Sequence, residues 1–587
     1  MDGLSPKSEL PSRRQAAWWR TKVTIHQARR ILADLGPQGP SRHRPSASLR
    51  DTPVLARSQT ALWSTNPGPE WVLEAGKVEN LRRAIRCFDG IEVSAGQVLS
   101  FWAQVGPPWA MRGFVEGREV REGCIIPSIA GGLCQLSNAL YDVARRAGLE
   151  IVERHAHSRV VPGSAAAAGH DATVMWNYVD LRVRSTHAFR VEAELEADAL
   201  VVRLRGLATP RPSAIPTPRP SSPLRVVGAT DGVRSCLSCE QDCHRARPAP
   251  TTRQGHRAWL VDGVWPEHDA WLQAERGADD VLLLPIDGRR FRRARYAWTT
   301  QGFAAVHGFP ALTLQRALAS RRLAAQGAAR QRAQLHHEAR LAQAMADRVP
   351  ASATRLVVAQ NLLPHLWRAG ALGGRRFEVL MTRPPMTQLH AQLDRAHRLH
   401  PHSPTLADFR ADPGLMEAET EALAAADRIV TPHAGLARSF GERAVKLGWA
   451  RPPTTPRSPS TAARPRLWLP ASTLGRKGVY ELREALEGLD VDLVLGGPVL
   501  EDPDFWGRPT RRGGLEDADC VVLPAHVETA PRRLLAALAR GIPVIASDAC
   551  GLEPEPGLTV VPVGDAGALR VALARHVDAK APASSVA

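Results

Sequence analysis

The chain is 587 residues long, and its 76 lysines and arginines exceed its 59 acids, giving a net charge of +17. At roughly 150 residues per domain this length favours three or four domains. A hydrophobic share of 44% excludes wholesale disorder. The positive charge is spread along the chain, with no basic helix or aromatic stacking strip, so the composition does not favour nucleic-acid binding.

The N-terminal residues contain no apolar run long enough for a signal peptide, and no later stretch of about 18 apolar residues could span a membrane. We therefore expect a cytoplasmic protein. Trp18 and Trp19 stand beside arginines and leave peripheral membrane contact open, although a short docked helix explains them as well. Eight cysteines in such a chain favour thiols, metal ligands or a nucleophile over a disulfide framework.

Composition and periodicity divide the chain into segments and predict a multidomain α/β protein. We expect an Arg/Pro-rich arm (1–69), an α+β domain (70–206), a Pro-rich linker (207–228), a cysteine knuckle (229–255) and two Rossmann-like lobes (256–450 and 465–577). Within the α+β domain we predict a helix over 78–85, a strand over 97–102, a helix over 134–147 and then strands over 150–154, 172–178, 180–184, 189–193 and 200–205.

Cys134 is the most informative residue of the α+β domain. It follows Gly131 and Gly132, which permit a sharp turn, and it opens the predicted helix, where the helix dipole favours a thiolate. His157 and Asp171 follow at the edges of regular elements. Cysteine, histidine and acid in this order predict a nucleophile, a general base and its orienting carboxylate.

Three points about this predicted triad stay open. His155 is the alternative base, and a buried structural cysteine is the alternative interpretation of Cys134. Gln135 and Ser137 are candidates for an oxyanion site or for orientation. Cys87 and Cys124 lack such a setting, and we interpret them as structural.

The region from about 70 to 205 resembles the VanW family. The words that carry the resemblance are KVENL (77–81), FDG (88–90), GQVLSFW (96–102), GFVEGR (113–118), GGLCQ (131–135), ERHAHS (153–158) and DATV (171–174). The family is named for an accessory protein of glycopeptide-antibiotic resistance. The resemblance implies the fold of this domain but leaves its biochemical activity undefined.

A second cysteine motif, Cys236-x2-Cys239-x3-Cys243, follows the linker, with His244 adjacent. Three soft ligands in one loop suit Zn²⁺, and His244 would complete a tetrahedron. An iron–sulfur cluster is the alternative, as are three thiols that bind no metal or form a reversible disulfide. We expect a structural clip between domains.

From residue 256 onward, apolar strands alternate with Ala/Leu/Arg-rich helices, which predicts parallel sheets covered on both faces. Arg476 and Lys477 lie between Gly475 and Gly478 at a strand-to-helix turn, a setting that binds anions. A later strand leads to Glu528, a helix, and the GIPVIAS segment (541–547).

This second half looks like the GT-B glycosyltransferases that retain configuration and use nucleotide-sugar donors. The resemblance implies that Arg476 and Lys477, with Gly475, contact the donor diphosphate and that Glu528 is the first residue of an E-x7-E motif. The second glutamate, which in the family holds the ribose, is replaced here by Ala536. His365 and Arg383 are candidates for acceptor contacts.

Three functions follow from these motifs. The first is a glycosyltransferase that moves a sugar from a nucleotide-sugar donor to a glycan or peptide acceptor. The second is a cysteine-dependent hydrolase or acyltransferase with a non-catalytic GT-B module. The third is a non-enzymatic assembly protein. The basic turn at 475–478 favours the first, whereas Ala536 favours the other two.

Overall fold

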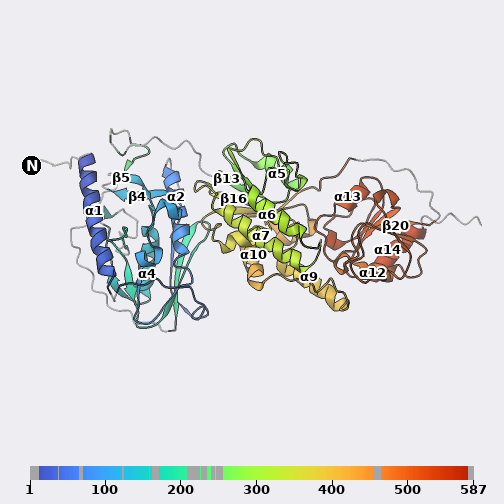
Figure 1. Ribbon diagram of the computed structural model, residues 1–587, viewed down its shortest axis with the longest axis horizontal. Helices are drawn as coiled ribbons and strands as arrows, with labels where there is room; N and C mark the ends of the chain where they lie inside the picture. Colours follow the sequence, from blue (N-terminus) through green and yellow to red (C-terminus); the bar gives the residue numbers. More distant parts are fainter. Residues whose placement is uncertain are drawn as a thin grey trace, which may run out of the picture. The chain divides into compact units, whose positions relative to one another are not determined.

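The computed structural model describes residues 12–36, 39–64, 70–121, 124–157, 159–160, 171–207, 225–226, 234–239, 243, 245, 256–324, 326–453 and 464–578. The chain forms two compact units. Helices and strands of both are labelled along the chain in Figure 1. The first is Met1–His256 with Val349–Arg355 and Gly370–Arg376, and the second comprises the remaining residues. In the described ranges, no helix combines the length and apolar character needed to cross a membrane.

The first unit contains four α-helices and twelve strands among its described residues. The helices are α1 (Arg13–Asp34), α2 (Trp71–Ile85), α3 (Phe101–Val105) and α4 (Cys134–Arg146). The strands are β1 (Val54–Ala61), β2 (Glu92–Val93), β3 (Val98–Ser100), β4 (Glu116–Arg121), β5 (Cys124–Ile129), β6 (Glu150–Glu153), β7 (Arg159–Val160), β8 (Arg182–Arg184), β9 (Phe189–Leu195), β10 (Ala199–Gly206), β11 (Arg225–Val226) and β12 (Arg234–Ser235).

The main sheet of this unit is antiparallel, in the order β1-β10-β9-β2, and α4 packs on β1 and β10. Residues of β9 alternate between buried and more exposed positions, because only one face of the sheet covers the core. The buried side chains of α4, among them Leu136, Leu140 and Val143, recur at helical spacing and join that core. The predicted α+β architecture is confirmed.

The described residues of the segment 1–69 include helix α1 and strand β1. Strand β1 pairs with β10 along its whole length, so the sheet begins before residue 70. Helix α1 is docked at its C-terminal end, where Arg30 bonds Glu153 and Asp34 pairs with Arg182 at 2.7 Å.

Two predicted strands have a different structure. The run 97–102 is a strand only to Ser100, whose side chain accepts a hydrogen bond from Ala103 N and so begins α3. The segment 172–178 is no strand beyond one bridge, Met175 to Val179. Its first backbone groups are bonded to side chains of α4 instead, since Ala172 N donates to Asn138 and Ala172 O accepts from Ser137.

The second unit contains two parallel sheets. Its N-terminal lobe comprises β13 (Arg257–Leu260), α5 (Pro266–Glu275), β14 (Val281–Leu284), β15 (Ala305–Gly308), α6 (Pro310–Arg321), α7 (Ala328–Ala346), β16 (Arg355–Ala359), α8 (Leu363–Arg368), β17 (Arg376–Leu380), α9 (Met386–Leu399), α10 (Pro413–Ala425), β18 (Arg428–Thr431), α11 (Ala434–Phe440) and β19 (Ala444–Lys446). Its C-terminal lobe comprises β20 (Arg466–Leu469), a short 3₁₀ helix (Gly475–Lys477), α12 (Val479–Ala485), β21 (Asp492–Leu495), β22 (Thr510–Arg512), β23 (Cys520–Leu523), α13 (Arg532–Leu538), β24 (Val544–Ser547), β25 (Leu558–Val561) and α14 (Ala566–Asp578).

The strand orders are β15-β14-β13-β16-β17-β18-β19 and β22-β21-β20-β23-β24-β25. Central strands such as β23 and β24 are buried at every residue, as expected for parallel strands covered on both faces. In each lobe the first three strands extend the sheet in one direction, and the later strands are added on the other side of the first strand. The strand order therefore reverses between β13 and β16 and between β20 and β23. Ligands of such sheets bind at the carboxyl ends of the strands at this reversal.

Candidate active sites

Cys134 is the first residue of α4, and its sulfur is partly buried beside the 171–175 segment. The Sγ atom lies 3.8 Å from Val174 O. Ala130, which precedes Gly131, has a left-handed backbone with a φ of 61°, and Gly132 has a φ of 94°. The turn between β5 and α4 therefore has the sharp geometry that the glycines predicted.

His157 links Cys134 to Asp171. Its Nδ1 lies 2.7 Å from Asp171 Oδ2, while Asp171 is 2% exposed and also pairs with Arg154 at 2.8 Å. Burial alone would lower the pKa of His157, but hydrogen bonds with Asp171 and Cys134 and the charges of both raise it to about 9. The pKa of Asp171 falls to about 2, because hydrogen bonds from His157 and the charges of His157 and Arg154 outweigh its burial.

The structure thus brings the three residues of the predicted triad together. His155 points elsewhere, since its Nε2 lies 3.1 Å from Glu153 Oε1. Gln135 and Ser137 are bonded away from the sulfur: Gln135 donates to Thr60 and Ala61, and Ser137 donates to Ala172 O. Arg154 and Asn138, which hold Asp171 and the residue after it, were missed from the sequence, although Arg154 stands directly before the histidines.

A second candidate site lies at the strand-order reversal of the C-terminal lobe. Lys477 follows β20 and Glu528 follows β23, the two strands that flank this reversal. Lys477 Nζ lies 2.8 Å from Glu528 Oε2, and both side chains are largely buried. Burial would raise the pKa of Glu528, but the charge and hydrogen bond of Lys477 and two backbone N–H groups lower it. The site therefore holds an ion pair at the position where parallel sheets bind nucleotides.

The other residues of the predicted donor turn have distinct roles. Arg476 donates to Gln326 at 2.8 Å. The N–H of Gly475 donates to Thr405 Oγ1 and Glu501 Oε1, so protein groups already satisfy it. Gly478 has a φ of 72°, and a Cβ atom there would lie 1.9 Å from Pro524 O. Only glycine lets the turn approach the end of β23 this closely.

The two lobes meet at this edge of the C-terminal sheet. Arg532 of α13 pairs with the buried Glu267 at 2.6 Å, and His433 Nε2 lies 2.8 Å from Thr529 O. Glu267 belongs to the first turn of α5, directly after β13 of the N-terminal lobe. Residues from both lobes therefore border the candidate donor site.

The corresponding edge of the N-terminal lobe carries a polar network that the sequence analysis missed. Asp262 follows β13 and pairs with Arg316 at 2.9 Å, and Asn361 after β16 donates to Asp262 and to Glu338. Burial raises the pKa of Glu338 despite the nearby Arg316. An acid directly after the apolar run at 258–261 is the sequence signal that could have identified Asp262.

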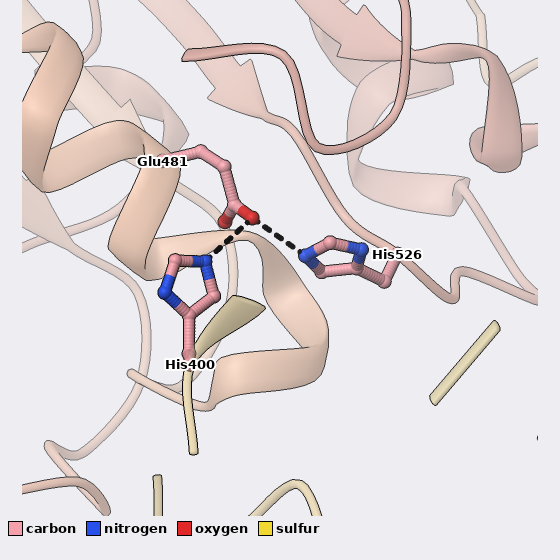
Figure 2. Close-up of side chains that lie close together, drawn as sticks. All are labelled: His400, Glu481 and His526. Atoms are coloured by element: carbon pink, nitrogen blue, oxygen red, sulfur yellow. Dashed lines mark hydrogen bonds and ion pairs between the residues drawn. The ribbon is translucent and has the colours of Figure 1, made fainter. Parts of the chain in front are cut away.

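One three-residue cluster has donor atoms close enough for a metal ion. One possible ligand atom from each of His400, Glu481 and His526 lies within 4.8 Å of the other two (Figure 2). No other such group of three occurs among the residues that the structure describes. Both imidazole Nε2 atoms lie near the same oxygen of Glu481, at 2.9 Å for His400 and 2.8 Å for His526. The backbone N of His526 also donates to Arg476 O, so the cluster is joined to the predicted donor turn.

The remaining predicted site residues lie in several different parts of the chain. Cys236, Cys239 and Cys243 are described, whereas His244 lies outside the described residues, and the cysteines of the described chain form no disulfide. Arg383 pairs with Glu419 at 2.8 Å. The pKa of His365, in α8, is lowered to about 4 by burial and by Arg368. Ala536 lies on α13, which extends from the loop that carries Glu528.

Comparison with known proteins places a defined family domain in the first unit. Residues 76–205 match the family described as VanW like protein. The chain is 31% identical over 137 residues to the vancomycin B-type resistance protein VanW of Enterococcus faecalis. This aligned region covers 22% of the present chain and 49% of the Enterococcus protein. The chain is 32% identical over 108 residues to the uncharacterized protein YoaR of Bacillus subtilis, covering 18% and 35%. The chain thus spans about half or less of the length of these relatives.

Solved structures to which the second unit is similar include the following two proteins. The lipopolysaccharide outer core galactosyltransferase WaaB in its apo form covers 56% of this chain and 91% of its own, with 14% identity and a TM-score of 0.32. HepE of Anabaena in complex with UDP and glucose covers 55% and 89%, with 12% identity and a TM-score of 0.33.

Proposed function

We propose that the second unit transfers a sugar from a nucleotide-sugar donor to an acceptor hydroxyl. The observation that supports this most directly is the pair of Lys477 and Glu528 at the carboxyl ends of the two strands where the strand order reverses. A nucleotide bound there has its diphosphate beside a cation and its sugar beside a carboxylate.

The chemistry follows from these charges. As the bond between sugar and diphosphate breaks, negative charge develops on the leaving phosphate. Lys477 and the neighbouring Arg476 can stabilise that charge without a metal ion, because fixed cations in a partly buried site need no reorganisation. Ala536 offers no carboxylate for the ribose, so nucleotide affinity depends more heavily on the basic turn.

The proposal is tested by a thermal-shift screen of the full chain against UDP-, GDP- and TDP-linked sugars. A ligand at 100 times its Kd adds about 2.7 kcal/mol to folding stability. We expect one donor to stabilise the protein and the combined Arg476→Ala and Lys477→Ala changes to abolish the effect. Lys446→Ala, at a lysine that is 45% exposed and pairs with Glu553, is the control and keeps it. The absence of a shift with every donor would reject nucleotide-sugar transfer.

The assembled triad in the first unit supports a second candidate function, acyl transfer or hydrolysis by Cys134. The sulfur would attack an acyl carbon, the bond to the leaving amine or alcohol would break, and His157 would give that group a proton. Water or a second acceptor would then cleave the thioester. Close placement of His157 between Cys134 and Asp171 is the observation behind this candidate.

Its test is the rate of alkylation of Cys134 by iodoacetamide, followed by peptide mass spectrometry across pH. We expect His157→Gln to slow the reaction at neutral pH by roughly 10-fold or more, as in other cysteines activated by a neighbouring imidazolium. Alkylation of Cys87 in the same samples is the internal control. Equal rates at Cys134 in the variant and the unaltered protein would reject the nucleophile.

A further inference from the structure

Strand β12 joins the cysteine knuckle to a second sheet of the first unit, which has three strands in the order β12-β5-β4. It pairs in parallel with β5, with Arg234 opposite Cys124 and Ser235 opposite Ile125. The ladder continues one residue further, since Cys236 N donates to Ile125 O at 2.9 Å. The start of the knuckle is therefore fixed in register beside Cys124, which precedes it by more than a hundred residues.

This register places Cys124 and Cys236 on the same face of the sheet. Successive residues of a strand alternate between its two faces, and Cys236 stands two positions after the residue paired with Cys124, so the two cysteines share a face. The residues on the opposite face of the sheet agree with this placement of the two cysteines. Ile125 and Leu237, each one residue further along, pack together with Leu73 of α2 in one apolar cluster. The two cysteines must then point away from that cluster.

The chain turns directly after β12, because Ser238 N donates to Ser235 O at 3.2 Å. Cys239 and Cys243 follow Cys236 by three and seven residues, the short spacing of ligands in a metal-binding knuckle. Both of these cysteines are partly buried. No three of these sulfurs lie within 4.8 Å of one another in the ranges that the structure describes, so binding an ion would draw them together.

We propose that the fourth ligand of this knuckle is Cys124 and not His244. A structural Zn²⁺ ion is then bound by four thiolates, those of Cys124, Cys236, Cys239 and Cys243. Four sulfur ligands at about 2.3 Å satisfy the tetrahedral preference of Zn²⁺. The ion neutralises the mutual repulsion of the thiolates. It also cross-links the segment after the linker to β5, so Cys124 is a ligand where the sequence suggested a merely structural residue.

The experiment measures zinc by mass spectrometry in the purified full chain after reconstitution with ZnCl₂ and removal of loosely bound metal. We expect about one ion per chain, the stoichiometry of a closed four-ligand site. Cys124→Ser should lose the ion as completely as Cys239→Ser. His244→Ala and Cys87→Ser should keep it, the latter because Cys87 packs against the main core. A protein that binds no zinc, or that loses it in His244→Ala and keeps it in Cys124→Ser, would overturn the proposal.

A second measurement distinguishes the loss of a zinc ligand from the loss of zinc through misfolding of a variant. Co²⁺ in place of Zn²⁺ gives a sulfur-to-cobalt charge-transfer absorption that grows with the number of thiolate ligands. The unaltered chain should give the four-thiolate intensity, and Cys124→His should still bind Co²⁺ with a weaker band. An unchanged band in Cys124→His would exclude Cys124 as a ligand, and the visible absorption of an iron–sulfur cluster in the purified protein would exclude zinc as the resident metal.

Discussion

Lys477 and Glu528, which follow the neighbouring strands β20 and β23, form an ion pair with 2.8 Å between Lys477 Nζ and Glu528 Oε2. The cation proposed to bind the donor diphosphate is therefore neutralised by the carboxylate proposed to face the sugar. A bound diphosphate would compete with Glu528 for Lys477, and this competition is measurable.

The first prediction concerns this competition. Glu528→Gln removes the competing charge and should tighten binding of the free nucleoside diphosphate by about fivefold, or about 1 kcal/mol. Lys477→Met should abolish binding and also destabilise the fold by about 1–3 kcal/mol, because it leaves a largely buried carboxylate without its partner. Isothermal titration and denaturation of both single variants and the double variant measure the coupling. Weaker diphosphate binding in Glu528→Gln would contradict the competition.

The second prediction concerns His157, whose pKa is raised to about 9. A raised pKa stabilises the fold fully below the ordinary value near 6.5, and the contribution is lost as pH rises through about 9. His157→Gln should therefore lower stability by at most about 3 kcal/mol at pH 6 and by much less at pH 10. Scanning calorimetry of the full chain at both pH values is the measurement.

The exposed His155 provides the matched control for this pH dependence. Its hydrogen bond reaches Glu153 rather than Asp171, and its side chain is 47% exposed. His155→Gln should change stability little at either pH. A His157→Gln effect that stays constant from pH 6 to pH 10 would show that His157 acts through packing rather than through its charge.

The fold could be predicted where one segment determines its own structure. The helix expected over 134–147 is α4, where Leu136, Leu140 and Val143 recur on one face, and the GIPVIAS segment (541–547) contains β24. The segment 172–178 could not. Its alternation resembles a strand, but side chains of α4 bond its backbone, and no local pattern contains that information.

The candidate sites likewise divide into those that a local sequence pattern indicates and those that depend on long-range packing. The order Cys134, His157, Asp171 could be read from the sequence, although only Cys134 begins a regular element and the other two residues lie in loops rather than at strand ends. The cluster of His400, Glu481 and His526 could not be read in this way, because His400 and His526 lie 81 and 45 residues from Glu481 and His400 belongs to the other lobe. The pairing of β12 with β5 is another long-range contact, which is why the sequence pointed to His244 and not to Cys124.

The third prediction concerns Gly478 in the basic turn. Gly478→Ala should destabilise the second unit by clearly more than about 1 kcal/mol and prevent nucleotide binding, because it combines a left-handed φ with a collision against Pro524 O. Gly541→Ala separates the two effects, since Gly541 has a φ of 70° but open space around the position of a Cβ atom. It should cost only about 1 kcal/mol. Equal losses of thermal stability in both variants would show that the approach to Pro524 is unimportant.

The fourth prediction concerns Glu481, which accepts from both His400 and His526 (Figure 2). Burial would raise its pKa, but the hydrogen bonds of the two histidines and the charge of His526 lower it. A lowered pKa contributes stability above the ordinary value near 4.5, and this contribution is lost as pH falls through the folded value. Glu481→Gln should therefore destabilise the second unit at pH 7 and have a smaller effect near pH 3.

The two histidines should differ in the same measurement. His526 is 3% exposed and also anchors the donor turn through its backbone, whereas the His400 side chain is 20% exposed and stacks on Tyr480. His526→Ala leaves Glu481 buried with one fewer donor and should cost about 1–3 kcal/mol, more than His400→Ala. Denaturant titrations at pH 7 compare the two. If His400→Ala proves the more damaging, contact between the lobes, and not support of the donor turn, is the main role of the cluster.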